Sequence, residues 1–220
     1  MKILLIFLTL SIFSIQSYAS IGTATKVEGK VFLERSGKPT PLKNSDKIEK
    51  NDIIITGPNS LALLEFENHS THKIGEKTRI KVNNIGKRGF FSLFSGSLIS
   101  FIKPKKDKKK HFRIKTKAAV VGVRGTKFFV SYGPSKNPND SWVCVNEGSV
   151  EVKSRKGKQK RIVNAGEGVS IFYKTKAVSE PAKLEWTKNI NWELNSEAKD
   201  LKNKISIEDA YKDLLDVDYD

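Results

Sequence analysis

Apolar and polar side chains alternate along much of this chain, and that period of two restricts its fold more than any other feature. Successive side chains of a strand point to opposite faces, so alternation is typical of strands that are buried on one face. Short turns rich in glycine, proline and asparagine separate the alternating stretches, and a βαβ pattern is absent. The alternation is clearest at residues 62–67, 79–83, 112–117, 143–145 and 150–152. We predict an all-β domain, and the sequence leaves open whether it is a β-sandwich or roll or a β-solenoid.

The segment Lys117–Val130 places two glycines between two stretches of strand-forming residues. Gly122 and Gly125 can take positive φ without a Cβ clash, so the segment is predicted to form a strand, a tight or bulged turn and a second strand. Arg124 lies inside this turn. We expect it to have a structural or surface role, with capture of a carboxylate as the alternative.

The same segment resembles the signature of the FecR domain, a β-rich extracytoplasmic module in which Val-x-Gly-Thr-x-Phe recurs. The matching residues are Val123, Arg124, Gly125, Thr126, Lys127 and Phe128. Other pieces resemble further parts of the family in the same order, namely residues 22–33, 42–59, 61–66, 70–74, 148–152 and 165–167. The resemblance covers Ile21 to Phe172 and implies a β domain outside the cytoplasm.

The family is named for a signalling regulator, and its membrane-bound sensors carry a cytoplasmic arm that binds a sigma factor. Only Met1 and Lys2 precede the first apolar run of this sequence. We therefore expect no sigma-binding arm, and the namesake role does not carry over.

The N-terminus has the pattern of a secretory signal peptide: Lys2, the apolar run Ile3–Ile15 and a small residue at Ala19. We predict cleavage after Ala19 and a periplasmic or extracellular protein, with an uncleaved membrane anchor as the alternative. No later stretch is apolar enough to be expected to cross a membrane. The predicted organisation is a signal peptide at 1–19, a FecR-like domain at 20–175, and a linker with a helical tail at 176–220.

The formal net charge is +16, and much of it falls in one run. The run comprises Lys103, Lys105, Lys106, Lys108, Lys109, Lys110, Arg113, Lys115 and Lys117. Such a run predicts binding to a polyanion, with a merely solvated loop as the alternative. Lipid head groups or an envelope polysaccharide are the expected partners, since export argues against genomic nucleic acid.

The chain from Pro181 onward changes character and is acidic, with six lysines and ten acidic residues. Apolar residues recur there every three or four positions, at Trp186, Ile190, Leu194, Ala198, Leu201 and Ile205. This spacing predicts an amphipathic α-helix, packed on the β domain or presented to a protein partner. Ser206 and Asp209 resemble a capping box and predict a second short helix as far as Leu215.

Residues suited to catalysis or metal binding are few. The histidines are His69, His72 and His111, a weak metal signal, and Cys144 lies in an apolar stretch typical of a buried thiol. No nucleophile motif is present. We therefore expect no enzymatic activity, cofactor or metal. The predicted function is a binding or scaffolding module of the envelope, and the alternative is a signalling component that engages a membrane protein through its C-terminal helix.

Overall fold

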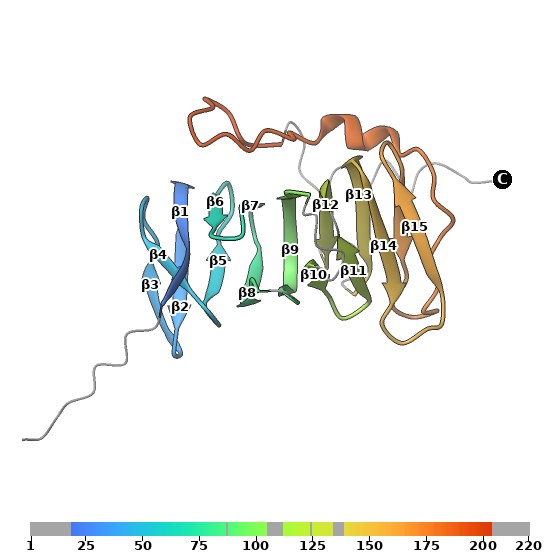
Figure 1. Cartoon of the computed structure of the whole chain (residues 1–220), viewed down its shortest axis with the longest axis horizontal. Coiled ribbons are helices and arrows are strands. Elements are labelled where there is room, and N and C mark those ends of the chain that lie inside the picture. The colour runs from blue at the N-terminus through green and yellow to red at the C-terminus, as the bar shows by residue number, and fades with distance from the viewer. Residues whose placement is uncertain (1–18, 87, 105–111, 124, 134–138, 204–220) are drawn as a thin grey trace, which may run out of the picture.

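A computed structural model describes residues 19–86, 88–104, 112–123, 125–133 and 139–203. Its strands lie side by side along the long axis of the molecule, from β3 and β4 at one end to β15 at the other (Figure 1). They form one open mixed sheet, in which β9 and β10 are parallel and the other described ladders are antiparallel. The all-β prediction is confirmed, whereas neither the sandwich nor the solenoid alternative is.

The strands divide into two rows that share β9. The first row is, in spatial order, β4 (Lys47–Glu49), β1 (Ser20–Glu28), β6 (Leu61–Phe66), β7 (Ser70–Ile74), the second half of β9 (Phe90–Ile102), β12 (Thr126–Tyr132), β13 (Ser141–Glu147) and β16 (Gly168–Ile171). The second row is β3 (Lys38–Pro41), β2 (Val31–Arg35), β5 (Ile53–Thr56), β8 (Arg79–Asn84), the first half of β9, β10 (Phe112–Lys115), β11 (Ala119–Val123), β14 (Ser149–Ser154) and β15 (Lys160–Asn164).

Gly96 marks the point at which β9 passes from one row to the other. Residues before it pair with β8 and β10, and residues from Gly96 onward pair with β7 and β12. Gly96 has φ +84°, and a Cβ there would lie 2.5 Å from the Cα of Thr78. Only glycine satisfies both conditions without a shift of the backbone, so this residue allows β9 to serve both rows.

One apolar core contains side chains from both rows. Leu64 and Val130 of the first row and Phe91 and Ile114 of the second are fully buried in it. The alternation seen in the sequence therefore corresponds to one face of each row turned toward this core, and each row has a second, outer face.

The segment that follows β16 crosses the outer face of the first row, which we call the covered face. Ile190 packs against Phe129 and Trp142, and Leu201 packs against Leu61 and Leu63. In Figure 1 this segment runs as an orange band along one side of the strands. We call residues 184–203 the strap, because they connect the β13 side of the first row to its β6 side.

The prediction of an amphipathic α-helix after Pro181 is wrong. The strap contains one short 3₁₀ helix, η1 (Glu185–Asn189), and its remaining described residues are not helical. Asn191, Asn195 and Asp200 each accept a hydrogen bond from the backbone N–H two residues later. Such local bonds compete with helical hydrogen bonding. The apolar stripe does pack on the β domain, as Ile190 and Leu201 show, while Ile205 and the predicted helix from Ser206 to Leu215 lie outside the described residues.

No helix within the described ranges is long and apolar enough to cross a membrane. The predicted signal peptide, with its cleavage after Ala19, involves residues that the structure leaves undescribed and remains a prediction.

Candidate functional site: the two outer faces of the sheet

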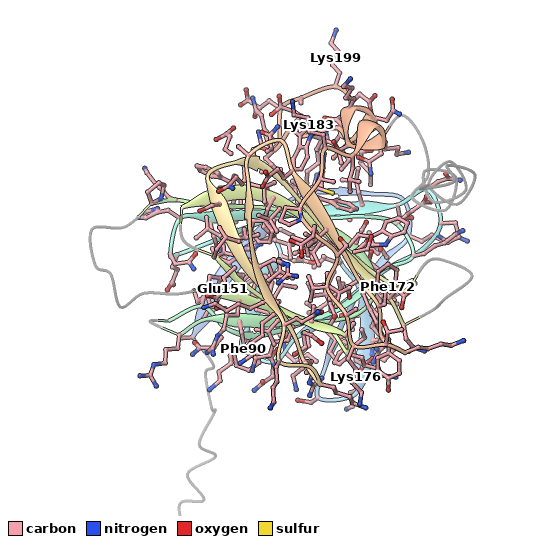
Figure 2. The ribbon with its side chains drawn as sticks, turned by 90° about the vertical axis from the view of Figure 1, so that its right-hand side faces the viewer. Phe90, Glu151, Phe172, Lys176, Lys183 and Lys199 are labelled. Carbon is pink, nitrogen blue, oxygen red and sulfur yellow. The ribbon has the colours of Figure 1, made fainter. Side chains whose placement is uncertain are left out.

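The outer face of the second row, which we call the bare face, has no described segment packed on it. Phe32, Phe94 and Ile162 remain 39%, 47% and 50% exposed there. Figure 2 shows Phe90 of this row on the opposite side of the molecule from Lys183 and Lys199, which belong to the C-terminal region. The two outer faces therefore differ: the chain covers one of them itself and presents the other.

Three lysines from separate strands fall on one line across the bare face. Lys153 of β14 pairs with Val120 of β11, which pairs with Lys115 of β10. Lys115 in turn pairs with Ser92 of β9, which pairs with Lys81 of β8. We call Lys81, Lys115 and Lys153 the lysine ladder. Each step of this ladder crosses two strand spacings, about 9–10 Å.

The middle lysine of the ladder is held over an aromatic ring. The Lys115 Nζ lies 3.7 Å from the centroid of the Phe90 ring, a cation–π contact. Partial burial lowers the pKa of Lys115, and the nearby positive charges of Arg113 and Arg155 lower it further. Positive groups are therefore crowded at this part of the face.

Carboxylates on the bare face are already paired. Glu151 accepts a bond of 2.8 Å from Lys160, and Glu34 accepts one of 3.0 Å from Arg79. No described carboxylate forms an ion pair with a ladder lysine. The lysine ladder therefore contributes net positive charge to the face.

The predicted polyanion-binding residues are only partly described. Arg113 and Lys115 occupy half-buried outward positions of β10, whereas Lys103 and Lys117 are exposed beyond the ends of β9 and β10. Lys105, Lys106, Lys108, Lys109 and Lys110 lie outside the described residues. The structure adds Lys81 and Lys153, which sequence reasoning missed. Their outward positions could be found from the alternation, but their alignment with Lys115 depends on pairing between distant strands.

The predicted strand, turn and strand around the glycine pair is present as β11 and β12. Gly125 has φ +67°, and a Cβ there would lie 2.9–3.0 Å from three atoms of Pro104. Gly122, by contrast, lies within β11 without positive φ, and a Cβ would be 3.7 Å from the nearest atom. Thr126 is buried at the start of β12, and Arg124 lies outside the described residues. Backbone geometry therefore requires glycine at Gly125 and does not require it at Gly122.

Asp52, one of the residues behind the family resemblance, has a structural role. Its carboxylate is 1% exposed and accepts hydrogen bonds from Arg35 Nε at 2.9 Å, Arg35 Nη2 at 2.8 Å and the Glu49 backbone N–H at 2.7 Å. This paired carboxylate ties β2 to the turn between β4 and β5, since a buried charge needs such partners.

The histidines and Cys144, the candidate metal ligands and nucleophiles, lie apart from one another. His72 is buried in the core, and its ring nitrogens contact the hydroxyls of Ser100 at 2.8 Å and Ser70 at 2.9 Å. Burial lowers the pKa of His72 to about 3, so its imidazole is neutral at pH 7. His69 is exposed in a turn, and His111 lies outside the described residues. Burial raises the pKa of the Cys144 thiol. Within the described ranges no group of three metal-ligating side chains occurs.

Beneath the strap, Lys73 of β7 is a buried cation. Its Nζ donates hydrogen bonds to the carbonyls of Asn191 at 2.5 Å, Glu193 at 2.9 Å and Leu201 at 2.8 Å. Burial lowers the pKa of Lys73 to about 8, which Glu193 and Asp200 partly counteract. An ammonium group has three N–H donors, so these three carbonyls match it completely.

These features define an all-β domain with one covered outer face and one bare, basic face. Residues 52–151 match the family described as FecR protein, which confirms the predicted resemblance. The chain has no match among curated proteins.

Solved structures with a similar fold include two crystal structures from Parabacteroides distasonis, each described as a "putative anti-sigma factor". One has 16% sequence identity and a TM-score of 0.51, covering 60% of this chain and 59% of that one. The other has 15% identity and a TM-score of 0.51, covering 62% and 64%. This chain thus spans about three fifths of the length of those chains, and at this identity the likeness concerns the fold alone.

Proposed function

We propose that this chain is a non-enzymatic binding module of the cell envelope that contacts an anionic partner through its basic residues. The observation that carries the proposal is the bare face, where Arg113 and Lys115 of the basic run stand beside two further lysines, Lys81 and Lys153. A surface on which positive groups gather and described carboxylates are paired attracts polyanions. The match of residues 52–151 to the FecR family supports the envelope location, because the resemblance implies a β domain outside the cytoplasm.

The test is a binding assay at low salt with anionic vesicles and an acidic polysaccharide. The wild-type protein should bind at least one of them with an affinity that falls as salt rises, because exposed charges are screened within about 10 Å at 0.1 M. Replacing Lys105, Lys106, Lys108 and Lys109 with Ser should weaken binding without a change in melting temperature. If the wild-type protein binds neither probe at low salt, the proposed function is wrong.

The second candidate is a component of envelope signalling that engages a separate membrane protein through its C-terminal segment. The fold likeness to proteins described as anti-sigma factors favours it. Because the strap covers apolar side chains, a partner would contact its outward side, where Glu193 and Lys199 are exposed. Deleting the strap would expose Phe129 and Leu63 and is a poor test, since an uncovered apolar face promotes aggregation.

A site-specific photo-crosslinker distinguishes the two candidates in intact cells. Placed at Lys199, it should form an adduct with a membrane protein if the strap is the contact. Placed at Lys153, it should form a polymer or lipid adduct if the bare face is the contact.

A further inference from the structure

We infer that the lysine ladder is a binding track for a linear acidic polysaccharide lying across the strands of the bare face. This inference rests on the proposed function and names the chemical class of the partner. It also places the contact on β8, β10 and β14, which goes beyond the basic run seen in the sequence.

The charges of the lysine ladder recur along one line. Lys153, Lys115 and Lys81 occupy one register line through the ladders of β14, β11, β10, β9 and β8. That line is perpendicular to the strands and so follows the direction in which the strands are stacked (Figure 1). Regular steps of about 9–10 Å along one line suit an elongated partner whose negative groups also recur along a line.

Exposed apolar side chains lie beside the ladder and beyond its Lys81 end. Phe94 lies two residues along β9 from Ser92, a member of the register line. Continued beyond Lys81, the line passes Ile53 of β5 and Glu34 of β2. Ile55 and Phe32 lie two residues from these positions, on the same side of the line as Phe94. Phe94 and Phe32 are 47% and 39% exposed. Sugar rings present C–H groups on their faces, which pack on exposed aromatic rings while their carboxylates reach the lysines.

A lipid surface and nucleic acid are the alternative polyanions. Phe94 and Phe32 lie within strands rather than at loop tips. The Lys115 Nζ lies 3.7 Å from the centroid of the Phe90 ring and so stays close to the sheet. These side chains form a flat surface and do not project as membrane anchors do, which disfavours a lipid surface. Nucleic acid also combines stacking with charge contacts, so it is included as an arm of the test.

The experiment compares two triple variants of equal charge. The ladder variant carries Lys81→Gln, Lys115→Gln and Lys153→Gln, and the control variant carries Lys50→Gln, Lys183→Gln and Lys199→Gln. The control lysines are exposed, and Figure 2 shows Lys183 and Lys199 away from Phe90 of the bare face. Probes are oligomers of hyaluronan and polygalacturonate, neutral dextran, oligo(dT), and phosphatidylglycerol vesicles, with melting temperature measured for each protein.

We expect the wild-type protein to bind the acidic oligosaccharides and not dextran. The ladder variant should bind them about tenfold more weakly, and the control variant within about twofold of wild type. Equal losses of affinity in both variants would show that the lysine ladder is not the binding track, while leaving the proposed function intact. Binding of oligo(dT) or vesicles in preference to the oligosaccharides would overturn the partner class. If no polyanion binds at low salt, the inference and the proposed function fail together.

Discussion

Lys73 Nζ donates a hydrogen bond of 2.8 Å to the carbonyl of Leu201, 128 residues further along the chain. Two more strap carbonyls accept from the same ammonium group. A second lysine, Lys26 of β1, donates to the carbonyl of Ala198. Two cations of the first row therefore hold the backbone of the strap over the covered face.

Replacing Lys73 with Met should loosen the strap. The variant keeps the apolar stem but leaves the carbonyls of Asn191, Glu193 and Leu201 without their donor, a loss of about 1–3 kcal/mol in the free energy of unfolding. Cys144, which is 1% exposed in the cluster that Ile190 completes, should then react faster with a thiol reagent. Lys50→Met, at an exposed position, is the control. Unchanged stability and thiol reactivity in Lys73→Met would show that the three hydrogen bonds do not retain the strap.

Replacing Ile190 with Ala tests whether the strap is an integral part of the fold. Ile190 is 7% exposed against Phe129 and Trp142, so the truncation should cost about 2–4 kcal/mol of unfolding free energy. Chemical denaturation measures this, with Lys199→Ala as the exposed control. A segment held free for a partner would give equal stabilities for the two variants.

Glycine should be needed at Gly125 and dispensable at Gly122. Gly125→Val forces a β-branched residue to φ +67° and places Cβ within 3.0 Å of Pro104, so we expect a loss of about 1–3 kcal/mol. Gly122→Ala meets nothing closer than 3.7 Å and should change stability by less than about 1 kcal/mol. Thermal melts of the two variants provide the comparison, and similar melting temperatures would contradict it.

Stability should fall on acidification because of His72. Burial lowers the pKa of this residue to about 3 in the folded protein, while the unfolded chain protonates near 6.5. Below that value the unfolded state binds a proton that the folded state does not. The contribution of neutral His72 to the free energy of unfolding is therefore complete above pH 6.5. It is lost as the pH falls toward 3, by about 1.4 kcal/mol per pH unit.

Urea unfolding at pH 7 and pH 5 measures this dependence. The decrease should become smaller in His72→Phe, which removes the titrating ring, and should persist in His69→Gln, which changes an exposed histidine. An identical decrease in wild type and His72→Phe would assign the pH dependence to other groups.

Local patterns in the sequence were sufficient for part of this structure. The alternation around Ile114 and Ile80 identifies strands because it depends only on the geometry of a single strand. The glycine pair likewise predicts the turn between β11 and β12, although Gly125 has positive φ and Gly122 does not. The FecR resemblance follows from short motifs of the same local kind.

The strap shows where local patterns mislead. Ile190, Leu194, Ala198 and Leu201 have helical spacing, yet they reach the covered face from a segment bent by side-chain-to-backbone hydrogen bonds such as that of Asn195. The apolar residues were correctly identified as a packing stripe. The helix predicted from their spacing is wrong. Burial against a sheet face formed by distant strands stabilises these residues in any backbone conformation that brings them to that face, and here local hydrogen bonds favour a non-helical one.

The sequence by itself determined that this chain forms strands, where most of them turn, and which side chains of each strand point outward. Only the tertiary structure decided which strands are neighbours, and hence that Lys81, Lys115 and Lys153 share one line and that Lys73 lies beneath the strap. The physical reason is that strand pairing joins residues far apart in the chain, whereas alternation and turn chemistry act within a few residues.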